Sequence, residues 1–136
     1  MSALNQDDRQ SLIDIANATR CRAYAPYSNY QVGAALRARS GRIFTGCNVE
    51  NAAYPHAMCA ERVAIFKAVS EGEKEFDVLA VVTPNGGSPC GGCRQVMAEF
   101  NPEMIVLIAD GEGKLIQETT VARLLPGAFT PKDLQG

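Results

Sequence analysis

Apolar residues recur at helical spacing in several stretches of the chain. In residues 7–23, apolar side chains such as Leu12 and Ile15 fall between charged ones, and Pro26 lies just beyond the stretch. This periodicity is typical of a helix with one buried face, and a proline ends such a helix. The same reasoning predicts helices over residues 7–23, 59–69 and 90–100, with a final helical turn over 120–125.

Other stretches favour strands. Residues 78–82 and 104–109 are continuous apolar runs, as expected of strands that are covered on both faces. Strands are also predicted over 30–39, 42–48 and 115–119, and Ser40-Gly41 reads as a two-residue hairpin turn. A hairpin followed by alternating strands and helices predicts an α/β fold, in which helices pack on a mixed sheet.

Length and charge narrow the functional classes. With 136 residues, the chain suits a single domain over residues 1–136. Its 13 basic and 15 acidic residues give a net charge of -2, and no run of Lys or Arg is present. This balance argues against binding long nucleic acid, which normally needs a positive patch. A small neutral substrate fits it better.

The ends and the cysteines bear on the compartment. Residues 1–10 are polar and do not resemble a signal peptide, and the longest apolar runs are too short to cross a membrane. We therefore expect a cytoplasmic protein with no membrane partner. Five cysteines in such a chain favour metal binding over a disulfide framework.

The strongest chemical signal combines three cysteines and one glutamate. Cys59 and Glu61 are separated by one residue, 28 residues lie between Glu61 and Cys90, and Cys93 follows three positions after Cys90. Three thiolates suit Zn²⁺ and leave the fourth tetrahedral position for water. Glu61 is placed to move protons to and from that water, which is the equipment of metal-assisted hydrolysis. Arg62 is the natural cation to offset the thiolate charge and hydrogen-bond the sulfurs.

Blander interpretations remain open for the cysteines. A lone C-x-x-C pair is also found in redox proteins and in structural zinc knuckles. A structural zinc site would need a fourth ligand, for which Cys21, Cys47 and His56 are the candidates. We favour ordinary roles for these three residues, and Glu61 argues against a module without catalysis.

Several longer segments together resemble the small, homotetrameric cytidine deaminases, with similarity over nearly the whole chain. The zinc motif alone would admit other base deaminases, whereas the segment 46–54 points to nucleosides. The segments that carry the resemblance are Ala25-Pro26-Tyr27-Ser28, Val32-Gly33-Ala34-Ala35-Leu36, Gly46-Cys47-Asn48-Val49-Glu50-Asn51-Ala52-Ala53-Tyr54, Cys59-Ala60-Glu61-Arg62, Ser88-Pro89-Cys90-Gly91-Gly92-Cys93-Arg94-Gln95 and Leu124-Leu125-Pro126-Gly127-Ala128-Phe129.

The resemblance implies a three-layer α/β/α sandwich with a mixed five-stranded sheet, and one Zn²⁺ per subunit. It implies hydrolysis of cytidine and 2'-deoxycytidine to the uridine forms and ammonia, in pyrimidine salvage. By resemblance, the metal ligands are Cys59, Cys90 and Cys93, and the catalytic residue is Glu61.

The resemblance also implies a substrate site. Asn48 and Glu50 would bind the ribose hydroxyls, for which an amide and a carboxylate offer both donors and acceptors. Tyr30, a phenylalanine in many members, would stack on the pyrimidine, and the N–H of Ala60 would bind the base carbonyl. Tyr54 and Phe129 would meet the pocket of a neighbouring subunit. Gly92 is a second departure, since alanine is usual there.

Two substrate alternatives stay open at this stage. A related deaminase of blasticidin S shares the cysteines, although Arg62 and the segment 51–54 favour cytidine. A polynucleotide cytosine editor is disfavoured by the size and charge of the chain.

Overall fold

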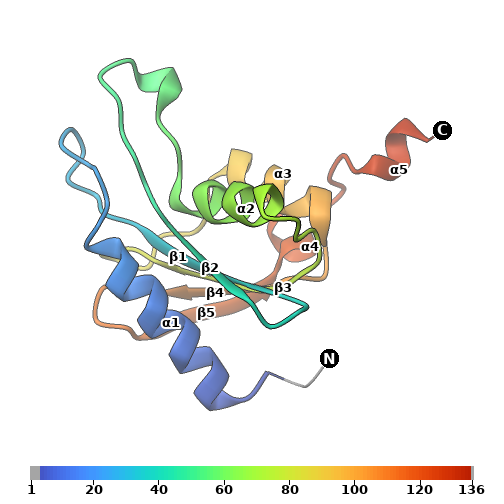
Figure 1. Ribbon diagram of the computed structural model, residues 1–136, viewed down its shortest axis with the longest axis horizontal. Coiled ribbons are helices and arrows are strands. Elements are labelled where there is room, and N and C mark those ends of the chain that lie inside the picture. The colour runs from blue at the N-terminus through green and yellow to red at the C-terminus, as the bar shows by residue number, and fades with distance from the viewer. Residues whose placement is uncertain (1–3, 136) are drawn as a thin grey trace.

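The computed structural model describes residues 4–135 and places a five-stranded sheet between two layers of helices (Figure 1). The strand order is β2-β1-β3-β4-β5, and only β3 and β4 run parallel. The strands are β1 (Gly33–Ala38), β2 (Ile43–Cys47), β3 (Phe76–Val82), β4 (Ile105–Ala109) and β5 (Leu115–Thr120). The predicted mixed five-stranded sheet is therefore confirmed.

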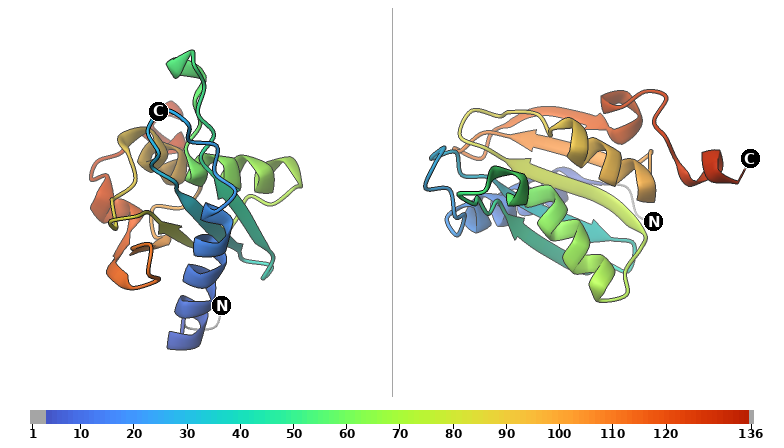
Figure 2. Two further views of the ribbon diagram at one scale, coloured as in Figure 1. Left: turned by 90° about the vertical axis from the view of Figure 1, so that its left-hand side faces the viewer. Right: turned by 90° about the horizontal axis from the view of Figure 1, so that it is seen from above.

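Helices cover both faces of this sheet (Figure 2). Helix α1 packs on one face, and α2, α3 and α4 pack on the other. The helices are α1 (Gln6–Arg20), the 3-10 turn η1 (Tyr54–His56), α2 (Ala60–Ser70), α3 (Gly91–Phe100), α4 (Val121–Leu124) and α5 (Pro131–Leu134). This confirms the three-layer α/β/α arrangement, since a sheet with two apolar faces must bury both.

Alternation along the strands divides the core into two halves. Successive strand residues point to opposite faces, so Leu79 and Val81 pack under α2 and α3, whereas Val78 and Ala80 pack under α1. All seven residues of β3 are buried, as the continuous apolar run predicted. Strand β3 is thus the centre of the sheet that positions both helix layers.

Helix α1 starts near its predicted position but ends earlier. Asn5 caps it, because the Asn5 side chain accepts a hydrogen bond from the Asp8 N–H at 2.8 Å. In return, the Asp8 carboxylate accepts from the Asn5 N–H at 3.3 Å. The predicted end at residue 23 is wrong. The chain leaves the helix after Arg20, since Tyr24 forms a β-bridge with Val49 instead.

The first strand also begins later than predicted, at residue 33 instead of 30. The side chain of Asn48 accepts from the N–H of Val32 and donates to the carbonyl of Tyr30, both at 2.8 Å. These backbone groups are therefore satisfied by a side chain and not by a neighbouring strand. The hairpin after β1 is confirmed, but its turn is longer than two residues. The Ala38 N–H donates to the Arg42 carbonyl and closes a loop over residues 39–41, in which Gly41 has φ 96°.

Three further differences concern short or charged segments. Strand β3 extends back to Phe76 because Asp77 is buried in it, with Arg39 Nε 3.8 Å from its carboxylate. The turn η1 lies within a stretch predicted to be loop. Helix α5 was not predicted. Its capping box was nevertheless visible in the sequence as Thr130 and Asp133, and the Asp133 carboxylate accepts from the Thr130 N–H at 2.8 Å.

No helix among residues 4–135 combines the length and apolar character needed to cross a membrane.

The sheet and α2 approach each other closely at Gly46 of β2. A Cβ at this position would overlap the carbonyl oxygen of Ala60 and lie 2.6 Å from the backbone nitrogen of Ala64. Both contacts are with helix backbone, which cannot move aside as a flexible side chain can. The absence of a side chain at Gly46 therefore sets the distance between β2 and the first turn of α2.

We expect Gly46→Ala to lower the free energy of unfolding by about 2 kcal/mol, because overpacking against backbone forces the helix away from the sheet. Thermal unfolding should show a Tm roughly 6 °C lower. Gly91→Ala is the matched control, since a Cβ there meets no atom within 4 Å. An unchanged Tm for Gly46→Ala would contradict the close approach.

Candidate active site

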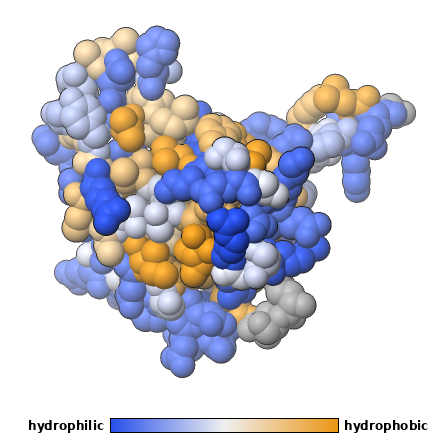
Figure 3. Space-filling model, viewed as in Figure 1, coloured by the Kyte–Doolittle hydropathy of each residue, from blue (hydrophilic) through white to orange (hydrophobic). Residues whose placement is uncertain are grey.

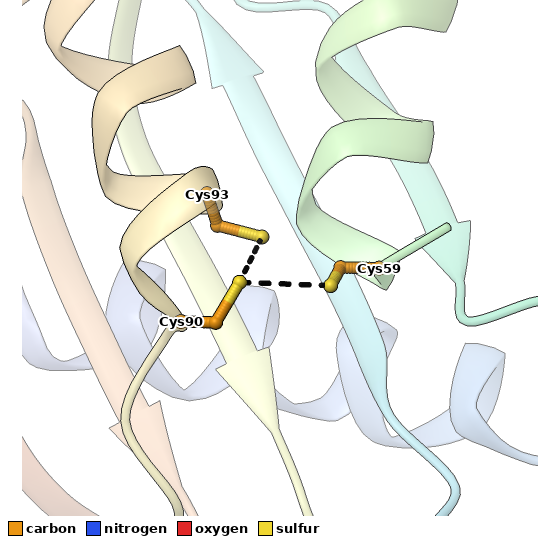
Figure 4. A group of neighbouring side chains, drawn as sticks. All are labelled: Cys59, Cys90 and Cys93. Atoms are coloured by element: carbon orange, nitrogen blue, oxygen red, sulfur yellow. Dashed lines mark hydrogen bonds between the residues drawn. The ribbon is translucent and has the colours of Figure 1, made fainter. Parts of the chain in front are cut away.

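Two helices begin at the same edge of the sheet and carry the three predicted cysteine ligands (Figure 4). Cys59 is the N-cap residue of α2, and Cys90 is the N-cap residue of α3. Cys93 lies in the first turn of α3 and is fully buried. Helix N-termini carry partial positive charge, so both helices direct favourable electrostatic potential toward the sulfur group.

The sulfur atoms form a compact group. Cys59 Sγ lies 3.8 Å from Cys90 Sγ, and Cys90 Sγ lies 3.5 Å from Cys93 Sγ. Zn–S bonds of about 2.3 Å in a tetrahedron imply sulfur–sulfur separations of about 3.8 Å. The three side chains therefore fit zinc by donor type and by spacing. Among the described residues, they are the one group of His, Cys, Asp and Glu side chains close enough to share an ion.

The thiols ionise unequally. Hydrogen bonds from Cys93 and then from Arg62 lower the pKa of the Cys59 thiol to about 5. The hydrogen bond to Cys59 and burial raise the pKa of the Cys93 thiol well above its usual range. A thiolate on Cys59 thus opposes ionisation of the adjacent Cys93 thiol.

Glu61 lies beside the sulfurs in the first turn of α2. Its side chain is only 4% exposed, although it borders the pocket described below. Burial raises the pKa of the Glu61 carboxyl to about 7, and the charge of Cys59 acts in the same direction. A carboxyl with a pKa near neutrality exchanges protons readily in either direction, which is the property required of a general acid and base.

Arg62 follows Glu61 and faces the thiolates. Its Nη2 donates to Cys59 Sγ at 3.3 Å, and this hydrogen bond raises the pKa of the guanidinium further. The buried Nε of Arg62 makes no hydrogen bond within the described part of the chain. A Cβ at Gly92 would lie 3.8 Å from Arg62 Cζ, so alanine would fit beside the guanidinium.

A pocket of about 690 Å³ opens beside the cysteines. It brings together nine of the residues selected from the sequence, which are Tyr30, Asn48, Glu50, Tyr54, Cys59, Ala60, Glu61, Arg62 and Cys90. Cys93 is buried behind the pocket wall, and Phe129 does not line the pocket of its own chain.

Asn48 and Glu50 line the pocket, and both side chains form hydrogen bonds with neighbouring loop residues. The Glu50 carboxylate accepts from the N–H groups of Tyr27 and Ser28 at 3.0 and 3.2 Å, and from the Ser28 hydroxyl. These hydrogen bonds lower the pKa of the Glu50 carboxyl, and the bond from the Ser28 hydroxyl has the largest effect. A carboxylate has about four acceptor sites, so one remains. The Asn48 amide keeps one N–H and one acceptor site beyond its bonds to Tyr30 and Val32.

Tyr54 and Phe129 lie on segments that project from the body of the molecule (Figure 1). Their side chains are 73% and 57% exposed. Tyr54 packs edge-on against the ring of Tyr27, with centroids 6.1 Å apart, and the Phe129 carbonyl accepts from Gln95 Nε2 at 2.8 Å. Figure 3 shows apolar surface on the C-terminal projection.

Sequence reasoning missed the loop between β3 and α3 as part of the site. Thr83, Gly87 and Ser88 line the pocket, and Thr83 is 4% exposed. The signal was present, because this loop follows a buried strand and leads directly to Cys90. Arg94 fixes its far end by donating to the Pro89 carbonyl at 2.8 Å and to the Ser88 hydroxyl at 2.9 Å.

The remaining candidate ligands do not join the sulfurs. Cys21 is an exposed residue at the end of α1, and Cys47 ends β2. His56 lies in the exposed turn η1. Among the described residues, none of the three lies in the group that could hold a metal, in line with the ordinary roles expected for them.

Comparison with known proteins agrees with this geometry. Residues 6–109 match the family model described as the cytidine and deoxycytidylate deaminase zinc-binding region. A cytidine deaminase of Sporosarcina psychrophila is 54% identical over 130 residues, which cover 93% of this chain and 95% of that protein. A blasticidin-S deaminase of Bacillus cereus is 34% identical, with 93% and 95% covered.

Solved structures give the same result. The crystal structure of cytidine deaminase from Burkholderia pseudomallei matches with a TM-score of 0.83 and 47% identity, covering 88% of this chain and 97% of that chain. The sequence match extends across the strands and helices that carry the cysteines, Glu61 and the pocket. The chain therefore belongs to the cytidine deaminase family.

Proposed function

We propose that the chain catalyses the hydrolytic deamination of cytidine and 2'-deoxycytidine, yielding uridine and 2'-deoxyuridine with release of ammonia. The observation that carries this proposal is a buried carboxyl, Glu61, beside three clustered thiols at the wall of a pocket. The relatives named cytidine deaminase support the substrate. In this proposal, residues 1–136 form one catalytic domain.

Cys59, Cys90 and Cys93 would hold one Zn²⁺ per subunit. Zinc supplies a Lewis acid that lowers the pKa of a water molecule, so that hydroxide forms near neutral pH. Glu61 takes up the proton released as the water oxygen bonds to C4 of the base. Glu61 would then deliver that proton to N3. It would next transfer the proton of the new C4 hydroxyl to the amino group, which leaves as ammonia as the C4–N bond breaks and the C4=O bond forms.

Arg62 would balance charge in this scheme. Three thiolates on Zn²⁺ leave a net charge of about -1, which opposes the acidification of water. The guanidinium hydrogen-bonded to Cys59 withdraws electron density from one sulfur and offsets this charge. Arg62 thereby keeps the metal electrophilic while Glu61 stays free to carry protons.

The other pocket residues would bind the nucleoside. Asn48 and Glu50 have the unused donor and acceptor sites that a sugar hydroxyl requires. The ring of Tyr30 would stack on the pyrimidine. The N–H of Ala60, at the first position of α2, would bind the base carbonyl.

The proposal includes assembly and setting. Tyr54 and Phe129 are exposed aromatic residues on projecting segments, which supports a homotetramer whose subunits complete one another's pockets. The thiols must stay reduced to bind metal, which supports the cytoplasm as the compartment. A role in pyrimidine salvage follows from the proposed substrates, and neither nucleic acid nor a membrane is a proposed partner.

A second candidate substrate is blasticidin S, which is favoured by the 34% identity to a blasticidin-S deaminase. The chemistry at Glu61 and the three cysteines would be unchanged, because both reactions replace an amino group on a pyrimidine by oxygen. The higher identity to cytidine deaminases favours cytidine. A purely structural zinc module is disfavoured, because it would gain no function from burying the carboxyl of Glu61, which costs free energy.

We expect the purified protein to deaminate cytidine and 2'-deoxycytidine, with far slower turnover of cytosine, CMP and blasticidin S. The pocket offers partners for a sugar, and a carboxylate at Glu50 disfavours a nearby phosphate. A UV assay of all five compounds, with metal content measured on the same sample, tests this. Turnover of blasticidin S alone would overturn the substrate assignment.

We expect Glu61→Gln to retain zinc and lose at least about 100-fold in kcat, because glutamine cannot carry protons. The Cys90→Ser variant should instead lose metal and bind less than half of the wild-type amount of zinc. Metal analysis and the cytidine assay on both variants check this pair. Near wild-type turnover of Glu61→Gln, or full zinc occupancy of Cys90→Ser, would refute the respective role.

Light scattering should give the mass of four chains. Phe129→Ala should shift the protein toward smaller species, and activity should fall with it, because the residue would complete a neighbouring pocket. Leu134→Ala, another exposed apolar residue on the same projecting segment, is the matched control. A wild-type protein that is monomeric and active would contradict the shared pocket.

A further inference from the structure

The loop between β3 and α3 forms one wall of the pocket and is held by a small network of side chains. The Tyr30 hydroxyl donates to Asn85 Oδ1 at 2.6 Å, and the Thr83 hydroxyl reaches the same oxygen at 3.4 Å. The Thr83 oxygen accepts from the Gly87 N–H at 2.7 Å. The Asn85 oxygen thus links Tyr30 to Thr83, and the Thr83 hydroxyl links on to the Gly87 N–H.

Close packing restricts this turn from two sides. A Cβ on Gly87 would lie 2.5 Å from the Tyr30 hydroxyl, and a Cβ on Gly86 would lie 2.8 Å from a side-chain carbon of Ile116 in β5. Gly86 also adopts φ 76°, which other residues rarely take. The backbone conformation at Gly86 therefore favours glycine, and a side chain at position 87 would require the Tyr30 hydroxyl to shift.

The two halves of the loop are held differently. Arg94 in α3 fixes the half next to the cysteines, through the Pro89 carbonyl and the Ser88 hydroxyl. The half that borders the pocket depends on Asn85, whose oxygen receives two hydroxyl groups. Loss of this oxygen would release the wall at Gly87 and leave the cysteines in place.

We propose that Asn85 is a positioning residue that fixes both the ring of Tyr30 and the pocket wall at Gly87 for substrate binding. Asn85 is exposed and does not line the pocket, so it acts through Tyr30 and Thr83. The hydrogen bond from the Tyr30 hydroxyl to Asn85 fixes the orientation of the ring. The catalytic readout of this proposal rests on the function proposed above.

The test is a double-mutant cycle of Tyr30→Phe and Asn85→Ala, measured with cytidine. Tyr30→Phe keeps the ring and removes only the hydroxyl. We expect each single variant to raise KM about fivefold, the usual worth of one hydrogen bond, and to change kcat less than twofold. The double variant should be no worse than either single variant, because both remove the same interaction.

Hydrogen exchange at the Gly87 amide supplies a readout that does not depend on activity. Exchange should be about fivefold faster in both single variants, whereas Asn85→Asp, which keeps an acceptor oxygen, should restore protection. Tyr24→Phe is the matched control, because this exposed tyrosine lies outside the pocket and makes no side-chain hydrogen bond among residues 4–135.

Each outcome decides the proposal. Unchanged KM in Tyr30→Phe, additive effects in the double variant, or unchanged exchange at Gly87 would overturn it. A lower Tm with unchanged KM would make Asn85 a structural residue only. If wild-type protein does not deaminate cytidine, the proposed function fails, and the positioning role is judged by exchange and by the Asn85→Asp restoration.

Discussion

The site depends on two helices that start at the same edge of one sheet. Cys59 and Cys90 can approach to 3.8 Å only because α2 and α3 pack side by side on the face opposite α1. The separation of α2 from the sheet is in turn set at Gly46, where helix backbone lies against strand backbone. A shift of the helix by the width of one methyl group would separate the sulfurs that are close enough to share an ion. The packing of an apolar core thus controls the geometry of a polar site.

The first turn of α2 combines three groups with opposite requirements. Cys59 is held as a thiolate, Arg62 as a cation beside it, and Glu61 as a carboxyl whose pKa is raised to about 7 by burial. Consecutive helical positions point in different directions, so each side chain meets a different environment. Arg62 reaches across to the sulfur, whereas Glu61 stays desolvated at the pocket. One helical turn therefore holds a thiol, a guanidinium and a desolvated carboxyl, which are the groups that the proposed roles of ligand, counter-charge and proton carrier require.

Much of the fold and the metal site could be predicted from the sequence. The apolar run of β3 predicted a strand buried on both faces, and the spacing of Cys59, Cys90 and Cys93 predicted that their sulfurs lie close together. The start of β1 could not be predicted, because it depends on the side chain of Asn48, sixteen residues away from Val32. The place of Thr83 and Gly87 beside Cys90 could have been read from the sequence, but the hydrogen bonds that join this loop to Tyr30 could not. The structure of the loop follows from contacts with distant residues, which no local pattern records.

The fit of the Tyr30 hydroxyl against Gly87 has a consequence for how the sequence can change over time. A side chain at position 87 would collide with that hydroxyl, so the two positions are not free to vary independently. Loss of the hydroxyl first would open space for a methyl group at 87, whereas the reverse order would pass through a crowded intermediate. The position of a single oxygen atom therefore couples residues 30 and 87, because a side chain at 87 requires that oxygen to shift or to be absent.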